Sequence, residues 1–169
     1  MNIKKMSGVI AILLLFAACG KNVMYNEIYK FKDYQWQRLS EDKKNGNAIE
    51  FTDIEVKDCD TPYDVFVNVR HSSVINTDKI QFLVEVISPN GTRRANKHIM
   101  KLKDREGTKF IGDVMGDLYD VEDKVKSYMS FTETGTHTIR ITNLSQPFVI
   151  VGIVDLSLKI VKSDLDYNL

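Results

Sequence analysis

Apolar and polar side chains alternate strictly over much of this chain, and this pattern limits it to extended structure. From Tyr63 to Arg70 the odd positions hold Tyr, Val, Val and Val, whereas the even positions hold Asp, Phe, Asn and Arg. Successive side chains of a β-strand point to opposite faces, so a period of two marks a strand with one buried face. The same alternation recurs at residues 80–86, 98–102, 125–131, 137–141 and 154–160. No window of twelve residues carries a 3.6-residue apolar stripe, so we expect an all-β fold.

Turn signals divide these runs into short antiparallel strands. Asn90-Gly91 tolerates positive φ and predicts a hairpin between the runs at 80–86 and 98–102. Residues 49–51 alternate out of phase with residues 54–56, which predicts a bulge or a bend between sheets. Seven or eight short strands with regular turns are typical of an antiparallel sandwich. We therefore predict a jelly-roll-like β-sandwich of about eight strands over residues 47–169.

The start of the chain carries the pattern of a bacterial export signal. Lys4 and Lys5 precede an apolar run at residues 9–16, which is too short to cross about 30 Å of hydrocarbon as a helix. The Phe-Ala-Ala sequence before Cys19 resembles a bacterial lipobox, in which the cysteine takes a diacylglyceryl group and becomes the acylated N-terminus. We predict a signal peptide over residues 1–18 and a lipid anchor on Cys19. The alternative is an ordinary secretory signal that ends at a chance cysteine.

Residues 19–46 are predicted to link this anchor to the sandwich. The segment is polar with scattered aromatic side chains, and we expect it to be extended, with some of the aromatic side chains packed on the domain. Tyr34 and Trp36 are the candidates for contact with partner proteins. Residues 20–23 carry no acidic side chain, so signals for inner-membrane retention or surface export are missing. We therefore expect the outer membrane, with the domain facing the periplasm. The lipid chains would anchor the protein without a transmembrane helix, because two or more acyl chains together hold a protein stably at a bilayer.

The charge balance and the cysteine count exclude several classes of protein. The chain has 23 basic and 23 acidic side chains, and this formal net charge of zero argues against a mainly basic nucleic-acid binder. Two cysteines are too few for a disulfide scaffold or a four-thiolate zinc site. With Cys19 acylated, Cys59 has no partner within the chain. We expect its thiol to be buried, with an intermolecular bond as the alternative.

An acidic stretch at residues 112–123 is the best candidate for a metal site. Asp113, Asp117 and Asp120 supply carboxylates, but their spacing fits no standard calcium loop. A solvated turn is the preferred interpretation, and a calcium site is the alternative.

Few residues point to catalysis. His71, His98 and His137 lie far apart without an HxxxH pair, so we expect them to be half-exposed side chains on strands. A GxSxG turn, a distinctive carboxylate pair and a glycine-rich phosphate loop are all missing from the sequence. We therefore predict a protein that is not an enzyme, with no small-molecule substrate and no cofactor apart from the lipid on Cys19.

Several short motifs, in order behind the lipobox, resemble the gliding-motility lipoprotein GldH family of Bacteroidetes. Residues 60–70 (DTPYDVFVNVR) resemble the family's PYNLFINIRN stretch, and residues 131–141 (FTETGTHTIRI) resemble its FPxxGxYxFxI. Residues 152–160 (GIVDLSLKI) are similar to the family's closing GIxDVGLRI strand, and residues 110–113 (FIGD) fall where the family has a glycine-rich turn. The resemblance covers nearly the whole chain from the lipobox to about Lys162.

This resemblance implies a non-enzymatic envelope lipoprotein that is needed for gliding and linked to the type IX secretion machinery. Its implied partners are the membrane, through the lipid anchor, and envelope proteins of that machinery. The family offers no catalytic or cofactor residues, and only Cys19 carries over as the acylated residue. The rival hypothesis is a lipid-anchored jelly-roll module that binds glycan, with calcium at Asp113 to Asp123.

Overall fold

The computed structural model describes residues 22–38 and 48–164, so the predicted signal peptide and Cys19 lie outside the described residues. The described chain forms antiparallel strands in three sheets and one short 3-10 helix, η1 (Lys32–Tyr34). None of the helical structure in these ranges has the length and apolar character that a membrane crossing requires. The eight longer strands are β1 (Val23–Lys30), β3 (Ile49–Val56), β4 (Tyr63–Ser72), β5 (Lys79–Ile87), β6 (Arg93–Lys101), β8 (Leu118–Met129), β9 (Gly135–Asn143) and β11 (Ile153–Lys162). Three strands have three residues each: β2 (Gln35–Gln37), β7 (Asp113–Met115) and β10 (Val149–Val151).

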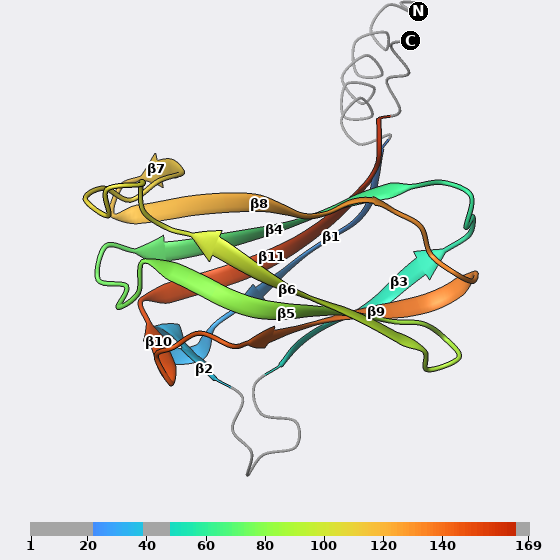
Figure 1. Ribbon diagram of the computed structural model, residues 1–169, viewed down its shortest axis with the longest axis horizontal. Helices are drawn as coiled ribbons and strands as arrows, with labels where there is room; N and C mark the ends of the chain where they lie inside the picture. The colour runs from blue at the N-terminus through green and yellow to red at the C-terminus, as the bar shows by residue number, and fades with distance from the viewer. Residues whose placement is uncertain (1–21, 39–47, 165–169) are drawn as a thin grey trace, which may run out of the picture.

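The pairing of the eight longer strands is that of a jelly roll. They pair antiparallel in nested order, with β5 against β6, β9 against β3, β4 against β8, and β1 against β11. Laid flat, these four pairs would form one long hairpin. The hairpin is folded into two sheets, because β4 also pairs with β11 and β5 also pairs with β9. The result is a sandwich of a sheet ordered β1-β11-β4-β8-β7 and a sheet ordered β3-β9-β5-β6 (Figure 1). The predicted all-β, jelly-roll-like sandwich is therefore confirmed.

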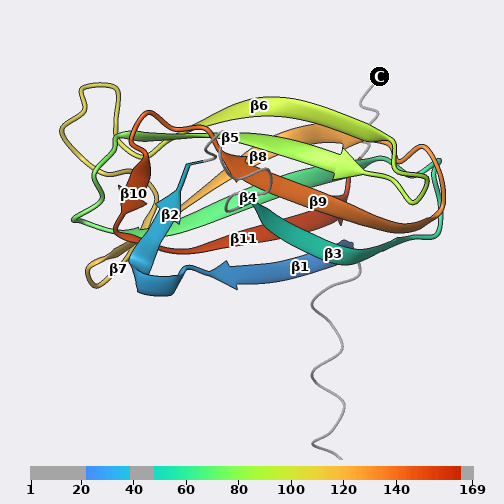
Figure 2. The ribbon, with the colours of Figure 1, turned by 90° about the horizontal axis from the view of Figure 1, so that it is seen from below.

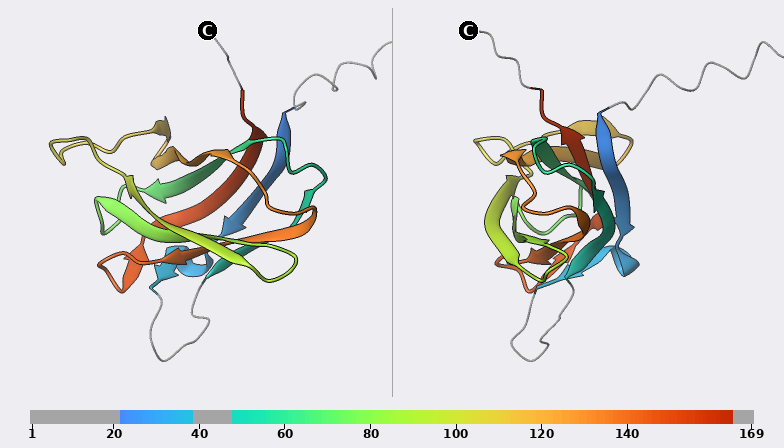
Figure 3. Two further views of the ribbon diagram at one scale, coloured as in Figure 1. Left: turned by 45° about the vertical axis from the view of Figure 1, so that its right-hand side comes forward. Right: turned by 90° about the vertical axis from the view of Figure 1, so that its right-hand side faces the viewer.

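The core lies between the two sheets, which face each other in the right-hand view of Figure 3. Alternate residues of β4 (Val65, Val67 and Val69) are fully buried, as the period of two predicts. They meet Ile139 and Ile141 of β9 in one apolar cluster, which spans both sheets. Removing this apolar surface from water is the main force that holds the sheets together.

The predicted hairpin and the predicted bulge are both confirmed. Gly91 has φ +85° in the turn between β5 and β6, and its amide donates to the Ser88 carbonyl. In β3 the register against β9 shifts between Phe51 and Ile54, and Asp53 there has φ +60°. This one-residue slip returns both apolar pairs of β3 to the buried face.

The prediction that residues 19–46 stand outside the sandwich is wrong for their described part. Residues 23–30 form β1, which pairs with β11 along its length and completes the five-stranded sheet. Residues 35–37 form β2, which pairs with β10. The sandwich therefore begins at Val23 and not at residue 47.

Candidate functional site

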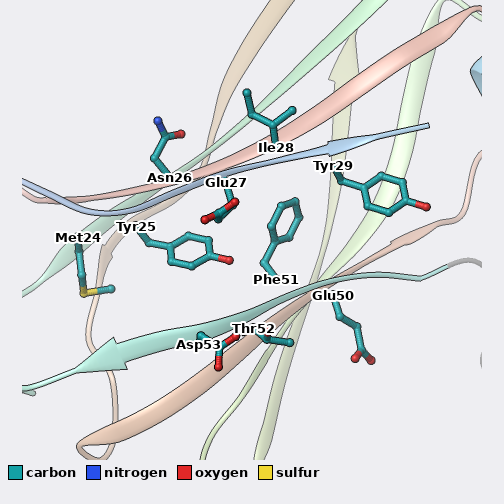
Figure 4. Close-up of a pocket in the computed structure, with 10 residues that line it drawn as sticks. All are labelled: Met24, Tyr25, Asn26, Glu27, Ile28, Tyr29, Glu50, Phe51, Thr52 and Asp53. Atoms are coloured by element: carbon teal, nitrogen blue, oxygen red, sulfur yellow. Dashed lines mark hydrogen bonds between the residues drawn. The ribbon is translucent and has the colours of Figure 1, made fainter. Parts of the chain in front are cut away.

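The sandwich has an open side, where β1 and β3 are edge strands of opposite sheets. Among the described residues, each is hydrogen-bonded to a single strand of its sheet, β1 to β11 and β3 to β9. Figure 2 shows the two strands running beside each other along this side. The gap between them is a surface groove of about 600 Å³, which we call the β1–β3 groove. It is lined by Met24, Tyr25, Asn26, Glu27, Ile28, Tyr29, Glu50, Phe51, Thr52 and Asp53 (Figure 4).

The two strands meet through aromatic side chains at the floor of the β1–β3 groove. The ring of Tyr25 packs edge-on against Phe51 with a centroid distance of 6.5 Å, and Phe51 is buried in the core. Figure 4 shows Tyr25 reaching from β1 towards β3, whereas Ile28 points away. Alternation along β1 therefore sends Tyr25 into the groove and leaves Ile28 59% exposed on the outer face.

The β1–β3 groove is acidic. Glu27, Glu50 and Asp53 line it, and none of its ten lining residues is basic. Glu50 is engaged by Arg140, whose Nη2 lies 2.7 Å from a Glu50 carboxylate oxygen. Among residues 22–38 and 48–164, no ion pair engages Glu27 or Asp53. Burial, together with the negative charges of Glu27 and Asp53, raises the pKa of Tyr25 to about 12.

Of the two predicted contact residues, the structure leaves only Tyr34 at the surface. Asp33 and Tyr34 have φ of 56° and 54°, and this sharp turn leads the chain from β1 into β2. Tyr34 is 60% exposed as a result. Trp36 points the other way, is 1% exposed and packs against Phe31 and Phe82. The prediction of Trp36 as a contact residue is wrong, because its indole belongs to the core.

The candidate calcium ligands are not gathered into a metal site. Asp113 on β7 and Asp120 on β8 are cross-strand neighbours, and Asp117 lies in the turn between the two strands. Asp120 is already bound by Arg70, whose Nε and Nη2 donate to its two carboxylate oxygens at 2.9 and 3.0 Å. In the described ranges no three His, Cys, Asp or Glu side chains come close enough to hold a metal ion. The prediction of a solvated turn holds for only part of the acidic stretch, because its residues from Leu118 onward belong to β8.

The histidines are more buried than the sequence suggested. His71 and His137 are both 0% exposed, so the prediction of half-exposed histidines is wrong for these two. His71 stacks on Tyr119 at a centroid distance of 5.4 Å, and burial lowers its pKa. His98 is the partly exposed one, and its Nε2 lies 3.0 Å from a carboxylate oxygen of Asp123. The structure therefore does not bring the three imidazoles together.

The thiol of Cys59 is partly buried. It lies between β3 and β4, packs against the apolar core and is not in a disulfide. The expectation of full burial is therefore too strong, since the side chain keeps some exposure.

Sequence reasoning missed the β1–β3 groove, because it did not identify β1 as a strand. The inward residues of β1 include Glu27, and its outward residues include Ile28, so the alternation of polarity is blurred. The signal that could have found it is the nested pairing, since a jelly roll needs an eighth strand before residue 49 to pair with the closing strand at 153–162.

Comparison with known proteins gives one family. The sequence model described as GldH lipoprotein matches residues 23–160, from the first residue of β1 to Ile160, two residues before the end of β11. A search of curated proteins found no match.

Proposed function

Because the chain belongs to the GldH lipoprotein family, we propose that it is a non-enzymatic part of the gliding and type IX secretion machinery that acts through contacts with envelope proteins. The family match is the observation that carries this proposal. It covers both large sheets and all eight longer strands except the last two residues of β11, so it concerns the whole sandwich and not one shared motif.

The proposed anchor is a lipid on Cys19, which holds the domain at the outer membrane on its periplasmic side. Val23, the first residue of β1, follows Cys19 by only four positions (23 − 19). Each buried acyl CH₂ contributes about 0.8 kcal/mol, so a diacylglyceryl group with a further N-acyl chain is a stable anchor. A domain tethered this closely meets membrane-bound partners at a raised effective concentration.

Contact, rather than catalysis, is supported by what the surface offers. Two of the three histidines are fully buried, so neither imidazole can reach a substrate at the surface. The surface instead presents unpaired strand edges and exposed aromatic side chains, among them Tyr34 at 60% exposure. Strand edges and exposed aromatic residues are features that proteins use to bind other proteins.

Deletion of the chromosomal copy in the native host tests the proposed function. We expect the deletion to abolish colony spreading and the export of type IX cargo, and a wild-type copy to restore both. Normal spreading together with normal export in the deletion strain would reject the proposal.

A further inference from the structure

The sandwich has four strand edges in its two large sheets, and three of them are poorly suited to accept another strand. The edge strand β6 carries Arg93, Arg94, Lys97 and Lys101, and such basic side chains discourage pairing. The edge strand β7 has only three residues, and the stretch of β8 beyond it, residues 121–129, carries the charged side chains of Glu122, Asp123, Lys124 and Lys126. The edge strand β3 is interrupted by its bulge at Asp53. Short edges, charged edges and bulged edges are the usual protections against unwanted pairing.

The edge strand β1 has fewer of these protections, because its charged side chains are Glu27 and Lys30 and its register shift lies at its start, between Val23 and Tyr25. Its register against β11 is regular from Tyr25 to Lys30, and it contains no proline or glycine. In an antiparallel ladder every second residue directs its N–H and C=O away from the neighbouring strand. Within the described ranges, β11 is the only strand that pairs with β1, so these groups face the β1–β3 groove. They can hydrogen-bond to an added strand.

The charges of the β1–β3 groove specify the kind of strand that fits. Glu27 and Asp53 flank Tyr25 from the two walls, and no basic side chain of the described chain pairs with either carboxylate. An added strand would place alternate side chains over these two carboxylates, and opposite charges on neighbouring strands attract each other. A strand with Lys or Arg at alternate positions therefore complements the groove.

A second copy of this chain fits the same edge less well. Two β1 strands paired antiparallel about Glu27 would place the two copies of Glu27 directly opposite each other, and like charges there are destabilising. Ile28 is exposed on the outer face of β1. A partner chain that buries this side chain and neutralises the charge of Glu27 therefore gains binding free energy from both contacts.

We infer that the free edge of β1 accepts an extended basic segment of a partner protein, which adds to the five-stranded sheet and lies in the β1–β3 groove. This inference rests on the proposed function, since it names the partner chemistry of a contact protein. The segment carries Lys or Arg next to Glu27 and Asp53, and its backbone pairs with β1.

Three synthetic peptides test this inference on the full chain purified in detergent. The first alternates Lys and Val, the second alternates Glu and Val, and the third alternates Lys and Pro. The third has the charge of the first but lacks backbone N–H donors at every second residue, so it cannot form a full ladder. We expect only the Lys-Val peptide to bind tightly and to slow hydrogen exchange of the β1 amides.

Matched variants separate charge from backbone pairing. Glu27→Gln with Asp53→Asn removes both charges at nearly constant shape, and asparagine tolerates the positive φ of residue 53. We expect the affinity for the Lys-Val peptide to fall about tenfold or more, as for the loss of charge-assisted contacts. Glu106→Gln with Asp117→Asn, two exposed residues outside the groove, should leave it unchanged.

A second pair of variants introduces a charged side chain on an edge strand itself. Ile28→Lys on β1 should block binding, whereas Ile99→Lys on β6 should not, although both isoleucines are exposed on edge strands, at 59% and 52%. Equal binding of the three peptides, protection of β6 or β7 instead of β1, or no binding would overturn the inference. A concentration-dependent dimer with protected β1 amides would overturn it in favour of a second copy.

The peptide-binding experiments and the deletion experiment test different claims, so the inference and the proposed function can fail separately. If deletion leaves spreading and export intact but the Lys-Val peptide binds at β1, the edge is a binding site with another role. If deletion abolishes both but the peptide does not bind, the contact role stands and the β1 edge is not its site.

Discussion

Asp64 shows how a single polar side chain joins three parts of the sandwich. It lies on β4 at 7% exposure and accepts hydrogen bonds from the Lys124 ammonium, the Ser163 hydroxyl at 2.6 Å and the Tyr128 amide at 3.0 Å. Burial opposes ionisation of the carboxyl, but these three donors outweigh it and hold the pKa of Asp64 below its usual value. The side chain therefore stabilises the fold as a carboxylate.

We predict that Asp64→Asn lowers the free energy of unfolding at pH 7 by about 2 kcal/mol, the order for weakening hydrogen bonds to a charged group. The stabilisation by Asp64 is complete above its unfolded pKa of about 3.9 and is lost as the pH falls through the lower folded value. The difference between wild type and variant should therefore shrink below about pH 4. Urea unfolding at several pH values measures it, with exposed Asp117→Asn as the control. A difference that stays constant down to pH 2 or so would contradict this account.

Gly112 occupies a position that admits no side chain. Its φ is +98°, and a Cβ there would lie 2.1 Å from the Asp120 carbonyl oxygen of β8. Gly91 has a similar φ of +85°, but a Cβ there meets nothing within 4 Å.

We predict that Gly91→Ala costs about 1 kcal/mol, the strain of the left-handed conformation alone. Gly112→Ala should cost several kcal/mol, because the β7–β8 hairpin must also move away. Thermal unfolding of the two variants measures this difference. Equal melting temperatures would show that the backbone at Gly112 shifts freely.

At the scale of elements, the chain from η1 to β2 places one aromatic residue outside and another inside. Trp36 fills the core beside Phe82, whereas Tyr34 is exposed. We predict that Trp36→Ala destabilises the fold by about 3–5 kcal/mol through the cavity that it leaves. Tyr34→Ala should change stability by less than about 0.5 kcal/mol. Denaturant unfolding measures both, and a stable Trp36→Ala variant would contradict the core position of the indole.

The basic side chains of β6 give a second prediction at this scale. Lys97 and Lys101 are exposed on this edge, and β6 pairs with β5 on its other side. Lys97→Val with Lys101→Val should leave the fold intact. The protein should then associate through the β6 edge, because that edge has lost two of its charged side chains. Light scattering against concentration measures this, with Lys97→Glu and Lys101→Glu as a variant that should stay monomeric. Monomeric behaviour of the valine variant would show that charge does not protect this edge.

At the scale of the whole molecule, strands with a regular apolar alternation could be predicted from the sequence, including the edge strands β3 and β6, and strands without it could not. The interior strands β4, β5, β9 and β11 alternate cleanly because one face of each packs mainly against apolar side chains in the core. The strand β1 was missed because its inner face borders the open β1–β3 groove and includes Glu27. The three-residue strands β2, β7 and β10 are too short to show any period.

The candidate site also has parts that could be predicted from the sequence and parts that could not. His71 and His137 continue the buried phase of Val69 and Ile139, so their burial could have been read from the alternation itself. The β1–β3 groove could not, because it depends on which two edges meet when the sheets close, and this is a property of the whole topology.

The most direct test of a membrane-tethered contact module is Cys19→Ser in place of the chromosomal copy, with labelled palmitate. We expect the wild-type protein to take up the label and the variant to remain unlabelled. The unlabelled variant should remain folded but leave the membrane fraction, and the strain should lose spreading and cargo export as the deletion does. A variant that still carries the label, or an unlabelled variant that supports normal spreading and export, would contradict the account.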